Sequence, residues 1–429
     1  MLHFAIARTE ACPNQRTVMS LPHSAVSPED RVANVLRSPK LLTREMLAGV
    51  ITALALIPEV ISFSVVAGVD PKVSLIASVV LCLALSVLGG RPAMVTAAAG
   101  SVALVIGPMV HQHGVQYILP AVLMAGVIQI LFGVLGMARL MRFIPQSVMT
   151  GFVNALGILI FFAQVPHFWS RSPLIVGLFV LTLLIVLWVP RYIKSIPSPL
   201  IAIVLLTLFT VSTGQILPTV GDEGSMSGGL PGLTELLVPL NVHTLSIIWP
   251  CALSIAFVGL LESLLTAKLV DELTATPSSK RRESIGLGVG NILSGFYGGI
   301  AGCAMIGQTI VNVEMGKGRS RISTVAAGVV LLILVTALSE VMAKIPMAVL
   351  AGIMAIVAIK TFSWHSVQPA TVKNAPIAET VVMLVTVAAT VSTGNLAIGV
   401  LGGIIVMVLL PARIRRRLKE EKSSPAQEK

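Results

Sequence analysis

Two glutamates lie inside long apolar stretches of the sequence. Glu59 occurs in LALIPEVISFS, within an apolar run over residues 46–69, and Glu262 occurs in FVGLLESLL. A carboxylate inside a membrane span costs at least about 2.5 kcal/mol on insertion scales, so such a residue is rarely accidental. Burial and a nearby anion both favour protonation. Either glutamate could therefore take up a proton when an anion enters.

An ionised carboxylate could instead hold Na⁺ together with hydroxyl and carbonyl oxygens. Ser263 and Thr266 lie beside Glu262 or one helical turn beyond it, and Thr309 could approach from a later apolar segment. The ion-coupling candidates are Glu59, Glu262, Thr266 and Thr309. A protonated glutamate that bonds to interrupted backbone is the structural alternative at either position.

Apart from Na⁺ or H⁺ as a coupling ion, the sequence predicts no cofactor. No spacing of residues resembles a metal site or a P-loop, and no nucleophile has a recognisable base. We therefore expect neither an enzyme nor an ATP-driven pump.

Two glycine-rich stretches are poor continuous helices. They read GGRPAMVTAAAGSVALVIGP, residues 89–108, and GFYGGIAGCAMIGQTIVN, residues 295–312. Each predicts an extended strand that leads into a half-helix, and a helix start carries about half a positive elementary charge. Two such starts face to face would bind an anion through backbone N–H groups, although tight helix packing would also use these glycines. The predicted substrate-binding residues are Ala98, Ala99, Gly100, Ser101, Gly302, Cys303, Ala304 and Met305.

Three uncharged polar residues are also expected at membrane depth. They are Asn154, Gln308 and Asn312. Each either lines the cavity or forms an interhelical hydrogen bond of modest strength.

The composition predicts the helices that must position these residues. Of the 429 residues, 55% are hydrophobic and only 11% are charged, against roughly a quarter charged in soluble proteins, and the mean hydropathy is +0.92. A span needs about 20 apolar residues, or fewer when it is buried among other helices. The sequence therefore predicts an all-α polytopic membrane protein with fourteen spans. They run approximately over 46–66, 73–89, 93–110, 115–137, 147–166, 174–190, 198–214, 245–267, 283–298, 302–315, 322–339, 346–360, 376–393 and 395–411.

The basic residues predict the orientation, because Lys and Arg concentrate on the cytoplasmic side. With the N-terminus inside, only Lys72, Arg171 and Lys344 of the 30 Lys and Arg residues fall outside. Both termini are thus expected in the cytoplasm, in a multi-pass protein of the cell inner (plasma) membrane. Topology and anionic lipid explain the net charge of +11 without nucleic acid. The predicted parts are a cytoplasmic arm (1–43), a first repeat (44–214), an extracytoplasmic loop (215–244), a second repeat (245–411) and a basic cytoplasmic tail (412–429).

The two halves echo each other in sequence. IPQSVMTGF at residues 144–152 resembles IPMAVLAGI at residues 345–353, and a similar offset carries Glu59 onto Glu262. Because each half has seven spans, an odd number, the second copy must be inverted relative to the first. In inverted-repeat transporters the site lies near the bilayer midplane, where interrupted helices point their ends at the substrate.

Long stretches of both halves resemble one known family. The segment AGVITALALIPEVISFSVVAGVDPKVSLIASVVLCLALSVLGGRPAMVTAAAGSVALV, residues 48–105, is similar to the start of the sulfate permease (SulP) family of anion transporters. LLESLLTAKLVDE, residues 260–272, agrees as well, and GNILSGFYGGIAGCAMIGQTIVNVEMGKGRSRIST, residues 290–324, looks like the family's tenth-span region. The resemblance covers about residues 44–411.

The resemblance implies an architecture and an assembly. It implies a core of spans 1–4 and 8–11, a gate of spans 5–7 and 12–14, a substrate between the third and tenth half-helices, and a homodimer in the lipid membrane. Family members commonly end in a cytoplasmic STAS domain, whereas this sequence stops soon after its last predicted span, so we expect a member without that domain. Ala98, Ala99 and Gly100 stand where many relatives have a glycine-proline pair, and Gln308 where a basic or hydroxyl residue is frequent.

The expected function is secondary active transport of a small inorganic anion, coupled to H⁺ or Na⁺. Sulfate and bicarbonate are the leading substrates, and a small organic anion is close behind. One alternative is a nucleobase symporter of the same architecture, in which Glu262 would bind the heterocycle. Another is an anion channel or membrane sensor that couples no gradients.

Overall fold

The computed structural model describes residues 32–136, 144–169, 171–193, 196–224, 226, 232–239, 241–368, 371 and 377–409. The predicted basic tail and most of the predicted N-terminal arm lie outside these residues, and residues 39–43 of that arm belong to the first long helix. The described chain is mostly helical, which confirms the predicted class.

In chain order the helices are α2 (Val32–Arg37), α3 (Pro39–Ala67), α4 (Pro71–Leu88), α5 (Gly100–His113), η3 (Val115–Tyr117), α6 (Ile118–Val134), α7 (Gln146–Phe168), α8 (Pro173–Trp188), η5 (Val189–Arg191), α9 (Ser198–Ser212), α10 (Val220–Glu223), α11 (Val242–Thr274), α12 (Lys280–Gly295), α13 (Ile306–Ile310), η6 (Val311–Met315), α14 (Arg321–Ala337), α15 (Ser339–Ala343), α16 (Met347–Thr361), η7 (Trp364–Val367), α18 (Ile377–Thr393) and α19 (Leu396–Leu409). The strands are β1 (Thr96–Ala98) and β2 (Gly302–Ala304).

Six helical segments of the described chain are long and apolar enough to cross a membrane. They are Pro39–Ala67, Pro71–Leu88, Val115–Val134, Gln146–Phe168, Pro173–Arg191 and Val242–Thr274. Five shorter apolar helices accompany them, namely α9, α14, α16, α18 and α19. Each predicted span overlaps a helix of the described chain, and the protein is a multi-pass membrane protein. The number of crossings and the inverted repeat stay predictions.

Prolines and a glycine set the ends of the first two long helices. Pro39 and Pro71 stand in the first turns of α3 and α4, where a missing N–H costs nothing. α3 ends at Gly68, whose φ of 70° lies in the left-handed region that favours glycine. Pro58 lies inside α3, directly before Glu59.

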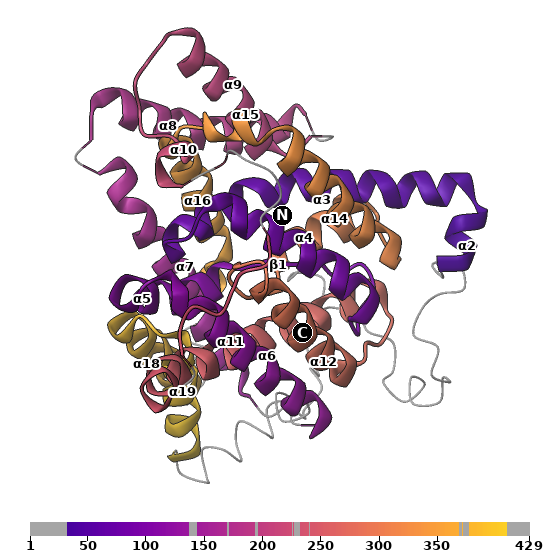
Figure 1. The fold of residues 1–429 in the computed structure, drawn as a ribbon, viewed down its shortest axis with the longest axis vertical. Helices are drawn as coiled ribbons and strands as arrows, with labels where there is room; N and C mark the ends of the chain where they lie inside the picture. The colour runs from indigo at the N-terminus through magenta and orange to yellow at the C-terminus, as the bar shows by residue number, and fades with distance from the viewer. Residues whose placement is uncertain are drawn as a thin grey trace.

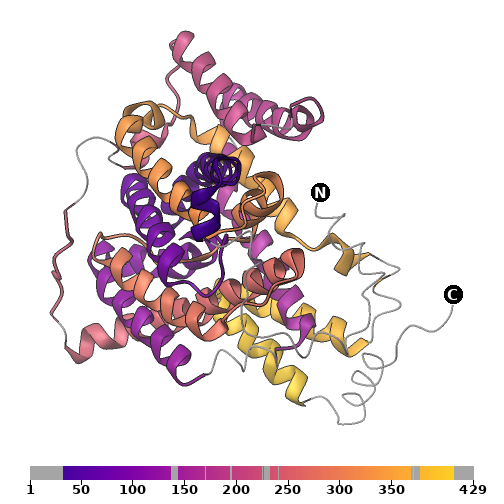
Figure 2. The ribbon, with the colours of Figure 1, turned by 90° about the vertical axis from the view of Figure 1, so that its right-hand side faces the viewer.

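The helices pack in two groups, which we call the core group and the gate group. The core group comprises α3, α4, α5, α6, α11, α12, α13 and α14, and the gate group comprises α7, α8, α9, α16, α18 and α19. Within the core group, α14 contacts α3 and α4, while α12 contacts α4 and α6. Within the gate group, α7 contacts α16, α18 and α19. α9 lies at one end of the molecule in both views (Figures 1 and 2). The grouping agrees with the core and gate that the family resemblance implies.

β1 and β2 form an antiparallel pair inside the core group. The register places Ala97 opposite Cys303, and all six strand residues are buried. Figure 1 shows β1 near the middle of the molecule, with helices around it. The predicted interruptions in the third and tenth segments are therefore confirmed.

Serine side chains close the outer edges of this strand pair. The Ala98 N–H donates to Ser78 Oγ of α4 at 3.1 Å, and the Ala304 N–H donates to Ser263 Oγ of α11 at 3.0 Å. Unpaired backbone groups cost several kcal/mol each in hydrocarbon. These contacts allow a two-stranded sheet to exist among apolar helices.

The Asn291 amide of α12 supports β2 in the same way. Its Oδ1 accepts from the Gly302 N–H at 2.8 Å, and its Nδ2 donates to the Gly302 carbonyl oxygen at 3.2 Å. Nδ2 also lies 2.9 Å from Oε1 of Gln129 on α6. Asn291 therefore substitutes for a neighbouring strand.

Close approach of α6 and α12 generates a first prediction. A Cβ at Gly126 would lie 2.7 Å from the Gly288 carbonyl oxygen, so Gly126→Ala should force the two helices apart. We expect a loss of about 1–3 kcal/mol in stability, the usual cost of overpacking. The measurement is the thermal midpoint of the detergent-solubilised protein. Gly177→Ala on α8 is the matched control, because nothing lies within 4 Å of a Cβ at that position. Equal midpoints for the two variants would contradict the packing argument.

Candidate functional site

α5 and α13 start directly after the two strands. Their N-cap residues, Ala99 and Met305, have φ values of −115° and −87°, and neither helix start carries a side-chain cap. α13 continues into η6, so this helical segment runs over residues 306–315. The first-turn N–H groups of both segments thus lack side-chain acceptors. α5 starts at Gly100, one of the predicted substrate-binding residues, and α13 starts at Ile306, one residue after the last of them.

Glu262 of α11 joins the two interrupted segments. Its Oε2 accepts hydrogen bonds from Ser101 Oγ of α5 and from Cys303 Sγ of β2, the latter at 3.1 Å. The glutamate is 8% exposed. Two donors on one buried carboxylate oxygen stabilise the charge. They also fix α5 relative to β2.

Glu59 lies half-buried on α3. Its carboxylate interacts with the Gln308 side chain of α13. The positive charge of Lys360 attracts this carboxylate and the negative charge of Glu262 repels it. Gln308 is 2% exposed, and its Oε1 has no hydrogen-bond partner in the part of the chain that the structure describes. Both glutamates and Gln308 therefore gather at the half-helices.

Gly307 marks the open side of α13. It is exposed, and a Cβ built there would meet no atom within 4 Å. Gly100, at the start of α5, is instead covered, because a Cβ there would lie 2.5 Å from Cε1 of Phe63. Of the two glycines at the half-helices, Gly307 is therefore the open one and Gly100 the covered one.

The two threonines predicted to take part in ion coupling bond to backbone. Thr266 Oγ1 lies 2.8 Å from the Glu262 carbonyl oxygen and 3.1 Å from the Ala304 carbonyl oxygen, and can donate to either. Thr309 Oγ1 accepts from the Val95 N–H at 3.0 Å. Both hydroxyls thus help to hold the strand pair in place.

The two asparagines lie in different places. Asn312 Nδ2 donates to the Ala93 carbonyl oxygen at 2.8 Å, at the entrance to β1. Asn154 lies on α7 in the gate group, where it accepts from the Ser363 N–H at 2.8 Å and donates to Ser366 Oγ at 2.9 Å. The structure does not bring Asn154 together with the other candidates.

Three residues at this site were missed by sequence reasoning. Phe63 lies one helical turn after Glu59, which was a usable signal for a shared helix face. Lys360 is the only charged residue of α16, a signal of the same kind as the intramembrane glutamates. Gly307 gave no signal, because an exposed glycine cannot be told from a packed one by spacing.

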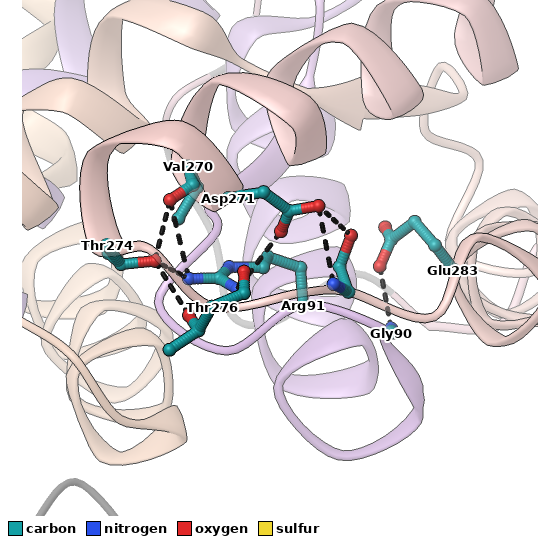
Figure 3. A network of polar contacts seen from close by, with 8 residues as sticks. Gly90, Arg91, Val270, Asp271, Thr274, Thr276 and Glu283 are labelled. Atoms are coloured by element: carbon teal, nitrogen blue, oxygen red, sulfur yellow. Dashed lines mark hydrogen bonds and ion pairs between the residues drawn. The ribbon is translucent and has the colours of Figure 1, made fainter. Parts of the chain in front are cut away.

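Charged side chains hold the turn that leads into β1 (Figure 3). Arg91 pairs with Asp271 of α11 at 3.0 Å and donates to the Thr276 carbonyl oxygen at 2.7 Å. The Gly90 N–H donates to Glu283 Oε2 of α12 at 2.7 Å. The turn is therefore tied to two neighbouring helices.

Two further arginines cap the last carbonyl groups of α4. Arg282 donates to the Val87 and Leu88 carbonyl oxygens at 2.6 and 3.1 Å. Arg321 of α14 donates to the Gly89 carbonyl oxygen at 2.7 Å. Cations are stabilising at a helix C-terminus, where carbonyl groups lack intrahelical partners. The path from α4 into β1 is thus fixed from several sides.

Comparison with known proteins agrees with this geometry. The model of the sulfate permease family matches residues 42–172 and 167–386, which include both interrupted segments and both glutamates. The chain belongs to the sulfate permease family.

Relatives and solved structures extend the comparison. YbaR of Bacillus subtilis (strain 168) is 47% identical over 369 residues, which cover 85% of this chain and 76% of YbaR. The bicarbonate transporter BicA of Picosynechococcus sp. is 27% identical over 364 residues, 76% of this chain and 64% of BicA. The chain thus spans less than two thirds of BicA. The solved transmembrane domain of a cyanobacterium bicarbonate transporter BicA superposes with a TM-score of 0.76 at 25% identity, and covers 85% of this chain and 97% of that one.

The turn before β1 generates a second prediction. Arg91→Gln leaves Asp271 without its cation and loosens the entrance to β1, so we expect a loss of about 1–3 kcal/mol in stability. The thermal midpoint in detergent measures it. Lys268→Gln on the same helix as Asp271 is the control, because Lys268 and Glu272 are 60% and 64% exposed and their ion pair is 3.8 Å long. Exposed pairs contribute roughly 0–1 kcal/mol. A loss for Arg91→Gln no larger than the control's would show that the network does not hold the turn.

Proposed function

We propose that the protein is a secondary active transporter of a small inorganic anion, sulfate or bicarbonate, coupled to H⁺ or Na⁺. The observation that carries the proposal is the pair of uncapped helix starts, α5 and the 306–315 segment, which begin at one buried strand pair. The family name and the name of the BicA relative favour these two anions. We further propose that both termini are cytoplasmic and that the protein works as a homodimer in the plasma membrane.

The charge at the half-helices suits a small anion. Each helix start contributes roughly half a positive elementary charge, so the two together balance about one negative charge. Gly100 and Gly307 lie in the first turns, and a Cβ at Gly307 would meet no atom within 4 Å. An oxyanion could accept several N–H groups at once there.

Proton coupling is supported by the environment of Glu59. The Gln308 amide can serve both protonation states of the glutamate, because its Nε2–H groups donate to a carboxylate while its free Oε1 accepts from a carboxylic acid. An anion that arrives nearby favours the acid. Uptake of the anion and uptake of the proton would then be linked.

Sodium coupling would use Glu262 instead. Ser101 Oγ and the Thr266 and Thr309 hydroxyls are the neighbouring hard oxygens, and Cys303 contributes a soft sulfur that Na⁺ does not favour. Glu262 is thus less suited to Na⁺ than a carboxylate among oxygens alone. The H⁺ alternative is the one we favour.

Transport into proteoliposomes tests the proposal. Purified protein is reconstituted, and uptake of radiolabelled sulfate or bicarbonate is followed with imposed pH or Na⁺ gradients. Gradient-driven accumulation of either anion is expected. Large currents that reverse at the anion equilibrium potential would indicate an uncoupled channel instead, and uptake of uracil or xanthine would indicate a nucleobase symporter.

Glu59→Gln provides the third prediction. The amide keeps the shape of the protonated carboxyl but cannot change charge, so anion exchange should persist while accumulation driven by a pH gradient falls at least about tenfold. Exchange and accumulation are measured in the same proteoliposomes.

Glu262→Gln is the matched comparison for this experiment. If coupling is to Na⁺ through Glu262, this variant loses Na⁺-driven accumulation while Glu59→Gln keeps it. Accumulation by Glu59→Gln at the wild-type rate under a pH gradient would assign Glu59 a structural role.

A further inference from the structure

We propose that Lys360 of the gate group sets the charge of the anion that the protein accepts, by adding the positive charge that a dianion needs. The inference rests on the proposed function, because it concerns the substrate of the same site.

Lys360 stands out on its own helix. α16 reads MAVLAGIMAIVAIKT, and nearly all of its residues from Met347 to Ala358 are buried. Lys360 is the only charged residue of this helix and is exposed. It forms no ion pair within 4.0 Å with any residue that the structure describes.

α16 lies next to the helix that carries Glu59. α16 packs against α3 of the core group, and the charges of Lys360 and Glu59 act on each other across that interface. Glu59 in turn lies beside Gln308 and the open space at Gly307. An anion that enters this space comes under the influence of Lys360.

Charge balance shows what Lys360 would change. The two helix starts supply about one positive elementary charge, which matches a monoanion such as bicarbonate. Sulfate carries a second negative charge that these starts leave unbalanced. Lys360 supplies the missing charge, whereas an ionised Glu59 opposes it. Loss of Lys360 should therefore weaken sulfate transport far more than bicarbonate transport.

The buried amide of Gln308 is an independent sign that the space beside Glu59 takes a ligand or proton. Gln308 is 2% exposed, and its Oε1 has no hydrogen-bond partner in the described chain. Buried polar atoms are rarely left unpaired unless a ligand, proton or water completes them. The unpaired atom lies on the helical segment that also carries Gly307.

Exchange assays on charge variants test the proposal. Wild type, Lys360→Gln and Lys360→Arg are reconstituted, and exchange of radiolabelled sulfate and of radiolabelled bicarbonate is measured at one alkaline pH without gradients. Alkaline pH keeps CO₂ low, so leakage across the bilayer stays small. Lys268→Gln removes an exposed lysine on α11 and serves as the matched control. Equal thermal midpoints establish that the variants are folded.

Lys360→Gln is expected to lower the ratio of sulfate to bicarbonate exchange by about tenfold or more. This is the effect expected when one unit charge is removed from within several ångströms of the bound anion. Lys360→Arg should restore the ratio to within about threefold, because it keeps the charge. Lys268→Gln should leave the ratio unchanged. Glu59→Gln removes the opposing charge and should raise the ratio.

Other outcomes overturn the inference. Equal loss of both anions in Lys360→Gln would assign Lys360 a structural role, and an unchanged ratio would show that its charge does not reach the site. Wild-type exchange of bicarbonate without sulfate contradicts this inference and leaves the proposed function intact, whereas wild-type transport of neither anion contradicts the proposed function itself. If the wild type exchanges sulfate alone, the inference predicts that Lys360→Gln abolishes sulfate exchange and that Lys360→Arg keeps it. Sulfate exchange by Lys360→Gln at the wild-type rate would then overturn the inference.

Discussion

Backbone N–H and C=O groups need partners wherever water is excluded, and the interrupted segments depend on this constraint more than any other part of the molecule. Two three-residue strands cannot satisfy their own edges. Ser78, Ser263 and Asn291 supply the missing partners from three different helices. The helix starts that follow the strands lack side-chain caps, and they begin at the break itself. The molecule thus satisfies the backbone around the break and leaves donors at the break itself, where a ligand can use them.

The same constraint divides the polar side chains of the core group by role. Thr266, Thr309 and Asn312 each bond to backbone at or next to the strands, so their first role is to hold the break open in one geometry. In the part of the chain that the structure describes, no hydrogen bond joins the Glu59 or Gln308 side chain to the backbone, and Gln308 Oε1, like Asn312 Oδ1, has no partner. Glu262 lies between these roles, because its carboxylate ties α5 to β2 and is also titratable. Glu59, whose side chain is not needed to hold the strands, is therefore a better candidate for proton exchange than Glu262.

Local sequence was sufficient to predict the helices and the two breaks, because apolar length and glycine clusters are each visible within about twenty residues. The roles of the two glutamates stay predictions. Local sequence was not sufficient for contacts that join distant segments. The Arg91–Asp271 pair joins two segments that no local pattern relates. The place of Asn154, beside Ser363 rather than at the half-helices, depends on how α7 packs against the segment after α16. Lys360 could have been noticed, but the positive-inside rule offered an adequate explanation for a lysine at a helix end.

The distribution of polar contacts also bears on movement. Inside the core group, ion pairs and arginine caps join α4, α11, α12 and α14, so displacement of one of these helices would break charge-assisted hydrogen bonds. Between the groups, α3 packs against α16, and Glu59 of α3 interacts electrostatically with Lys360 of α16. Asn395 Nδ2, directly before α19, donates to Ser254 Oγ of α11 at 3.3 Å. A sliding motion at that boundary would keep these charge-assisted hydrogen bonds within the core group, as a rigid displacement of the whole group requires. Such a displacement would change the separation of Glu59 from Lys360, and with it the electrostatic interaction between the two groups of helices.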